Sequence, residues 1–78
     1  MDFDIKIKVG LRIKELRTNK KITQEICALN SGIDRTYLAS VENGKRNISI
    51  INLEKICKSF NITLKEFFNS NIFIKGNK

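Results

Sequence analysis

The stretch that decides the fold reads TQEICALNSGIDRTYLASVENG and covers residues 23–44. Thr23 is a good N-cap residue, because its hydroxyl can accept hydrogen bonds from the free amides of a first helical turn. The helix that it opens should run to about Ser31. Gly32 should end this helix, since glycine readily takes the left-handed conformation found after helix C-termini.

A second helix should follow almost at once. Asp34 can cap it in the same way as Thr23, and Asn43 and Gly44 should mark its end. Only residues 31–34 therefore separate the two helices. Two helices joined by a turn of about three or four residues, with Gly near its start, must cross steeply, and this is the geometry of a helix-turn-helix.

The rest of the chain also predicts helices, because it has no Pro and its apolar residues recur at spacings of about three and four. We expect a helix over about residues 8–19 before this pair. Ser49 should cap a helix that ends near Asn61. A short last helix should start after Thr63, whose spacing from Glu66 is that of a capping box. The predicted fold class is all-α, with five helices.

The chain length suits one domain over residues 1–78, because a second hydrophobic core would need roughly another 50 residues. The folded core should cover about residues 8–70. In the tail of residues 71–78, two conformations stay open for residues 72–74, which can dock as a short extended segment or fray. Residues 76–78 should be disordered.

Charge and composition limit the function. The sequence has 15 Lys plus Arg against 8 Asp plus Glu, a formal net charge of +7, which is enough to attract a polyanion such as nucleic acid. It contains no His and no cluster of metal-ligating residues at ligand spacing, so we expect no enzyme, no metal site and no cofactor. Cys27 and Cys57 stand alone and are interpreted as small buried thiols.

The hydropathy pattern predicts no membrane partner. No apolar stretch of the sequence approaches the roughly 18 residues that a transmembrane helix needs. The N-terminus mixes acidic with apolar residues and lacks the basic start and hydrophobic run of a secretion signal. We therefore expect a cytoplasmic protein.

The helix after Asp34 carries the side chains best suited to reading DNA bases. Its face opposite the apolar positions is small or polar and holds no carboxylate. Arg35, in the first turn, can pair bidentately with guanine. Thr36 and Ser40 can hydrogen-bond base edges or touch a thymine methyl group. The candidate base contacts are therefore Arg35, Thr36 and Ser40, although an ordinary solvated helix face with one stray Arg remains an alternative.

Residues around this helix are placed to contact the DNA backbone. Helix N-termini offer free amides and a positive dipole end, which suit phosphate. Residues 45–47 form a compact basic turn after the reading helix. The alternatives are plain helix capping and a solvated run of charge. The candidate backbone contacts are Thr23, Gln24, Tyr37, Asn43, Lys45, Arg46, Asn47 and Ser49.

Four large apolar residues exceed what one small core absorbs, and their position after the reading helix suits a two-fold interface. They are Ile50, Ile51, Phe67 and Phe68. A homodimer would read a palindrome whose half-sites are one DNA turn, about 34 Å, apart. The alternative is that any of them belongs to an entirely intramolecular core.

The sequence resembles a known family over about residues 9–68. The segments TQE at 23–25, RTYL at 35–38 and VENG at 41–44 look like the phage Cro/repressor, or lambda-repressor-like, helix-turn-helix. Within that type, DRTYL at 34–38, KRNISI at 45–50 and the FF pair at 67–68 resemble restriction-modification controller proteins.

The resemblance implies both a function and residue roles. It implies a five-helix homodimer that binds double-stranded operator DNA upstream of its own gene and a restriction gene. Such a protein activates or represses according to operator occupancy, which leaves open a contact with RNA polymerase. The implied roles are phosphate contacts for Gln24 and Tyr37, base contacts for Arg35 and Thr36, backbone contacts for Arg46 and Asn47, and a bracing ion pair of Arg17 with Glu42.

The sequence departs from the family pattern at several positions. Lys21 stands where Gly is common in the turn before the helix-turn-helix. Cys27 replaces a usual Leu and Ile26 a usual polar residue, which points to an apolar face shifted by one position. Ala39, in place of a frequent Ser, removes a donor near the bases. The other functions left open are a phage-like repressor, an antitoxin-type autoregulator and a protein-docking helix-turn-helix module.

Overall fold

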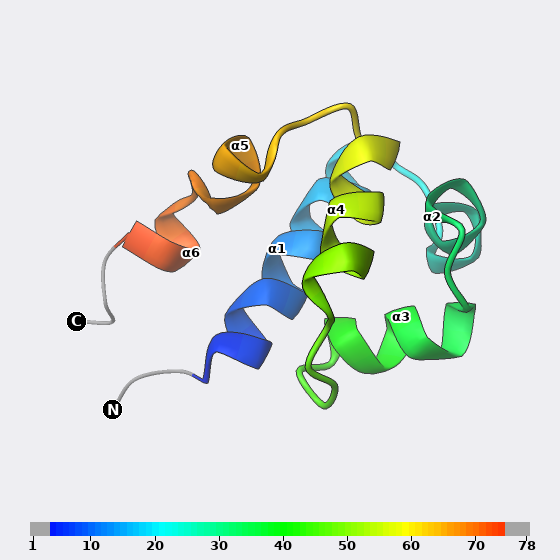
Figure 1. Ribbon diagram of the computed structural model, residues 1–78, viewed down its shortest axis with the longest axis horizontal. Coiled ribbons are helices and arrows are strands. Elements are labelled where there is room, and N and C mark those ends of the chain that lie inside the picture. Colours follow the sequence, from blue (N-terminus) through cyan, green and yellow to red (C-terminus); the bar gives the residue numbers. More distant parts are fainter. Residues whose placement is uncertain (1–3, 75–78) are drawn as a thin grey trace.

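The structure is a computed structural model that describes residues 4–74. These residues form six helices and no strand, so the all-α prediction is confirmed (Figure 1). The helices are α1 (Ile5–Asn19), α2 (Gln24–Ser31), α3 (Arg35–Glu42), α4 (Ile50–Ser59), α5 (Leu64–Phe68) and α6 (Asn71–Ile74).

The helix starts follow the predicted caps. The side chains of Thr23, Asp34, Ser49 and Thr63 each accept a hydrogen bond from the backbone amide three residues later. Thr63 and Glu66 complete the capping box in both directions. The first helix begins earlier than predicted, at Ile5, because Asp4 caps it.

Four helices end in the same Schellman motif, in which two amides beyond the helix bond back to carbonyls of its last turn. After α2, the amide of Ile33 donates to the carbonyl of Ala28 at 3.0 Å, around a left-handed Gly32. The turn after α1 has the same bonds around Lys21, which takes a φ of 59°. Lys21 therefore adopts the backbone conformation that a glycine would favour there.

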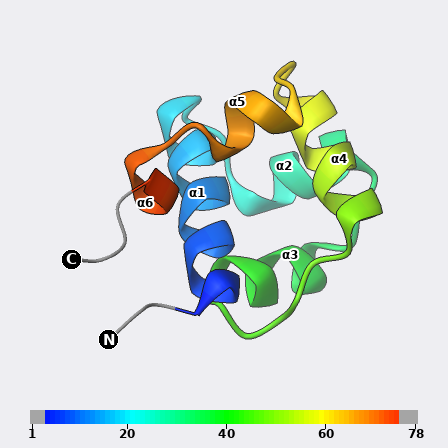
Figure 2. The same ribbon diagram turned by 60° about the vertical axis from the view of Figure 1, so that its left-hand side comes forward.

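The C-terminal tail differs from the prediction. Residues 71–74 form α6 rather than an extended or frayed segment, and this raises the helix count from five to six. The helix lies beside α1 in both ribbon views (Figures 1 and 2). The ring of Phe73 packs against the core, with its centroid 4.9 Å from that of Phe68. The partial burial of this ring stabilises the tail in its position against the core. The expected disorder of residues 76–78 lies outside the described residues.

The hydrophobic core lies between α1, α2, α3 and α4, and Phe67 of α5 closes it. Ile13, Leu38 and Ile56 are fully buried there together with Phe67. Gly10 allows α1 to approach α3 closely, since a Cβ atom at this position would collide with the carbonyl of Val41 and lie 2.8 Å from that of Glu42. This packing fixes α3 against α1. The opposite side of α3 lies at the surface.

The buried apolar face of α2 is not shifted by one residue. Cys27 is fully buried, whereas Ile26 remains exposed. The predicted shift of the apolar face is therefore wrong, because the smaller Cys27 still points into the core. Cys57 is also buried, and both thiols are free. No helix within residues 4–74 is long and apolar enough to cross a membrane.

Candidate nucleic-acid interface

Helices α2 and α3 form the predicted helix-turn-helix, with α3 along the outer edge of the molecule (Figure 1). Leu38 and Val41 bury one side of α3 in the core. Arg35 and Thr36 are exposed in its first turn, and Ser40 is half-buried one turn later. The structure thus places the three candidate base contacts on the outer side of one helix.

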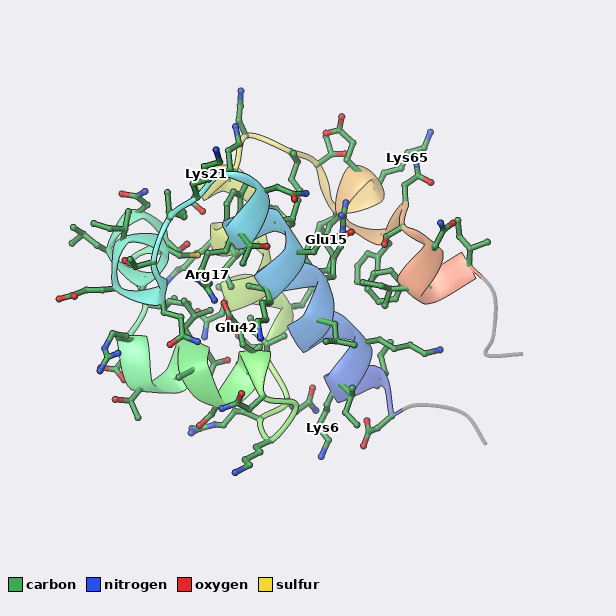
Figure 3. The ribbon with its side chains drawn as sticks, turned by 180° about the vertical axis from the view of Figure 1, so that it is seen from behind. Lys6, Glu15, Arg17, Lys21, Glu42 and Lys65 are labelled. Carbon is green, nitrogen blue, oxygen red and sulfur yellow. The ribbon has the colours of Figure 1, made fainter. Side chains whose placement is uncertain are left out.

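The carboxylate of α3 points away from this outer side. Glu42 is only 6% exposed, and its Oε2 lies 2.7 Å from Nε of Arg17, while its Oε1 accepts from Nη2 at 3.0 Å. The two side chains point toward one another between α1 and α3 (Figure 3). The hydrogen bond to Glu42, more than any other interaction, raises the pKa of Arg17. The ion pair expected from the family resemblance is present, and it leaves the outer side of α3 without negative charge.

Gln24 joins this network. Its Nε2 donates to Oε1 of Glu42 at 3.0 Å, so one carboxylate connects α1, α2 and α3. The side-chain amide nitrogen is therefore already engaged, and the phosphate contact of Gln24 stays a prediction. No local sequence pattern signals this bond, because the two residues are 18 positions apart.

Tyr37 connects α3 to the basic turn and to α4. Its hydroxyl accepts a hydrogen bond from the backbone amide of Ser49 at 3.2 Å. The guanidinium of Arg46 lies 5.0 Å from the centre of its ring, within the range of a cation–π contact. Burial raises the pKa of Tyr37, but the hydrogen-bonding groups of Asn52 and Ser49 outweigh burial and lower this pKa overall.

The candidate backbone contacts surround α3. Thr23, Asn43, Lys45, Arg46, Asn47 and Ser49 are exposed, and Gln24 and Tyr37 are half-buried. The amide of Lys45 donates to the carbonyl of Ser40 at 3.0 Å, which starts the basic turn directly beside α3. The structure therefore brings the basic turn next to the reading helix, although their contacts with DNA stay predictions.

The four residues assigned to a dimer interface differ in their exposure to solvent. Ile50 and Ile51 are 65% and 66% exposed, and Phe68 is 38% exposed. Phe67 is 0% exposed, so its assignment to an interface is wrong. Successive helical residues point about 100° apart, and Phe67 takes the direction that faces the core. Phe68 is left beside it at the surface.

Comparison with known proteins places this geometry in a family. The family model described as Helix-turn-helix matches residues 13–67. The control protein C.MunI of Mycoplasma sp. is 52% identical over 83% of this chain and 89% of its own length. The chain belongs to the restriction-modification controller proteins. Another relative of this controller protein, C.BamHI of Bacillus amyloliquefaciens, is 33% identical over 85% of this chain and 83% of its own.

Solved controller proteins share the fold. The crystal structure of C.AhdI from Aeromonas hydrophila has a TM-score of 0.80 and 41% identity, and covers 85% of this chain and 100% of its own. C.Esp1396I, solved as a tetramer in complex with its natural 35-base-pair operator, has a TM-score of 0.78 and 37% identity over 86% of this chain and 88% of its own.

Proposed function

We propose that this controller protein is a sequence-specific double-stranded DNA-binding transcription regulator of a restriction-modification system. One observation carries the proposal. Helix α3 presents Arg35 and Thr36 at the surface, while its own carboxylate, on Glu42, is buried and paired with Arg17. Such a helix has no exposed carboxylate of its own and offers the forked donor of Arg35, which suits the reading of guanine in a major groove.

The proposed roles divide by position. Arg35, Thr36 and Ser40 read bases. The DNA backbone is contacted by Thr23, Gln24, Tyr37, Asn43, Lys45, Arg46, Asn47 and Ser49. The side chains of Thr23 and Ser49 already serve as helix caps, so their backbone contacts would come from amides of the adjoining helix starts. Backbone contacts fix the register of the helix, and base contacts determine the sequence that is bound.

In the proposed function, the protein binds DNA as a homodimer. The exposed Ile50, Ile51 and Phe68 provide apolar surface for a second copy, and two copies would bind a palindromic operator. The operator complex of the similar C.Esp1396I supports this mode of binding. In the proposal the chain is a single domain that acts in the cytoplasm as a regulator rather than as an enzyme, and RNA polymerase is a further partner during activation.

A selection from randomised duplex DNA tests the function. The purified protein is compared at about physiological salt with Arg35→Ala and with Lys65→Ala, a loss of charge on α5, away from α3 (Figure 3). The wild type and Lys65→Ala should enrich the same palindrome with half-sites about one turn apart. Arg35→Ala should lose about 1–3 kcal/mol and relax one base position.

Two results would reject the proposal. An equal loss of affinity on every sequence in Arg35→Ala would show that Arg35 reads no base. If the wild type enriches no sequence and its binding disappears with modest salt, the net charge provides only generic attraction. The helix-turn-helix face would then be tested as a docking surface for a protein.

A further inference from the structure

The first turn of α1 lies against the segment that leads from α3 into the basic turn (Figure 2). A Cβ atom added to Gly44 would lie 2.8 Å from Cγ1 of Ile7 and 3.2 Å from its Cα. Both distances are shorter than ordinary van der Waals contact. The backbone of Gly44 therefore packs directly against Ile7.

This contact depends on the early start of α1. The sequence predicted a helix from about residue 8, whereas α1 begins at Ile5. The side chain of Asp4 accepts a hydrogen bond from the amide of Lys6 at 2.9 Å, and its carbonyl accepts one from the amide of Ile7 at 2.9 Å. The cap thus extends α1 by the turn that carries Ile7.

The flank of the basic turn that carries Arg46 and Asn47 also faces the start of α1, but more loosely. These two residues line the same cavity as Ile5 and Lys6, and its volume is about 150 Å³. Atoms that line an open space lack van der Waals partners on that side. The cavity therefore gives this flank little support, and the turn depends more on the contact between Ile7 and Gly44.

Hydrogen bonds tie both ends of the basic turn to α3. The amide of Lys45 donates to the carbonyl of Ser40 at 3.0 Å, and the amide of Ser49 donates to the hydroxyl of Tyr37 at 3.2 Å. These bonds fix where the turn leaves α3 and where it ends. Its distance from α1 is left to the packing of Gly44.

We propose that Ile7 is a positioning residue for the DNA backbone contacts of Arg46 and Asn47. It acts through Gly44, because its side chain sets the distance between α1 and the basic turn. A turn that is already ordered loses less conformational freedom when it meets a phosphate. This inference rests on the proposed function and deepens it, since it gives the first turn of α1 a part in DNA binding.

The test compares Ile7→Ala with Ile7→Val and Leu11→Ala. Valine keeps the Cα, Cβ and Cγ1 atoms that lie against Gly44, whereas alanine loses Cγ1. Leu11 is the matched control, because it lies one turn further along α1 and is 43% exposed, against 39% for Ile7. The two alanine variants should therefore shift the midpoint of urea unfolding by similar, small amounts.

Amide hydrogen exchange in the free protein measures the order of the turn. The amides of Lys45 and Ser49 are hydrogen-bonded at its two ends. Both should exchange faster in Ile7→Ala than in the wild type, because the turn has lost its contact with α1. Ile7→Val and Leu11→Ala should exchange at these amides like the wild type.

Binding is then measured on the duplex that the wild type enriches in the selection described above. Ile7→Ala should bind about threefold more weakly for each copy, hence roughly tenfold as a dimer, because the turn must now be ordered on binding. Its preferred sequence should stay the same, since no base contact changes. In an Arg46→Gln background the effect of Ile7→Ala should be smaller, because the contact that it positions is already lost.

Three results would overturn the inference. They are unchanged exchange at Lys45 and Ser49 in Ile7→Ala, equal losses of affinity in Ile7→Ala and Leu11→Ala, and a full effect of Ile7→Ala in the Arg46→Gln background. Each of them leaves the proposed function intact when the wild type enriches a palindrome. A wild type that enriches none rejects the function, and the inference with it.

Discussion

Nε of Arg12 donates a hydrogen bond to the carbonyl oxygen of Phe67 at 2.7 Å, across 55 positions of the chain. The same guanidinium donates to the carbonyl of Glu66 at 3.0 Å and lies 5.8 Å from the centre of the Phe67 ring. Arg12 also pairs with Glu15 at 2.9 Å. One side chain of α1 therefore satisfies the last carbonyls of α5, which a helix end would otherwise leave to water.

Arg12→Ala should loosen α5 and α6. Hydrogen bonds to charged groups contribute about 1.5–3 kcal/mol, so we expect a loss of that order in the free energy of unfolding. Amide hydrogen exchange should show faster exchange in residues 64–74 than in α2 and α3. Arg12→Lys, which keeps the charge but not the fork, should recover only part of the loss. Uniform acceleration across all helices would contradict this role.

Gly10→Ala should destabilise the protein, although alanine favours a helix. In an open helical position this change stabilises by roughly 0.5–1 kcal/mol, whereas here the new methyl group meets the backbone carbonyls of Val41 and Glu42. Overpacking costs about 1–3 kcal/mol. Urea unfolding measures the difference, with Thr18→Ala at an exposed position of α1 as the nearly neutral control. An unchanged or higher free energy of unfolding would disprove the close approach.

Lys21→Gly should stabilise the protein by about 0.5–1 kcal/mol. Lys21 has a φ of 59°, a left-handed conformation that costs a non-glycine residue about 1–2 kcal/mol, and glycine's greater freedom in the unfolded chain offsets part of the gain. The neighbouring Lys20 has a φ of −88°, so Lys20→Gly should destabilise instead. Thermal unfolding of the two variants should give shifts of opposite sign, and shifts of the same sign would refute the explanation.

Arg46→Gln should weaken binding to all DNA sequences by similar factors. A lost phosphate contact reduces the slope of log affinity against log salt by about 0.9 for each copy. Gln keeps much of the aliphatic stem of Arg46 while removing its charge. Titrations at several salt concentrations, with Lys65→Ala as the control, measure the slope. If the slope does not change, Arg46 does not neutralise a phosphate.

Alkaline pH should destabilise the fold through its thiols. Cys27 and Cys57 are 0% and 1% exposed, and burial raises the pKa of both above the ordinary 9.0. As pH rises through that value the unfolded chain loses thiol protons first, so the free energy of unfolding falls. Cys57→Ala should show a smaller fall than the wild type between neutral pH and about pH 9.5 in urea titrations. Identical falls would exclude the Cys57 contribution.

Local chemistry explains which elements the sequence predicted. Thr23, Asp34, Ser49 and Thr63 mark the helix starts because a cap bonds to an amide only three residues away. Gly32 and Gly44 likewise mark helix ends through their positive φ values. The helix-turn-helix follows from these short-range signals, and so does the exposure of Arg35 and Thr36 on α3.

The remaining features depend on contacts between distant segments. Whether Phe67 or Phe68 faced the core was decided by how α5 docks, and residues 71–74 became helical where Phe73 could pack against that core. By itself, the sequence determined where the helices of residues 24–68 begin and where those of residues 24–59 end, because the capping at these positions is a local hydrogen-bonding problem. Only the tertiary structure decided which apolar faces are buried, because burial depends on the partner that a face meets.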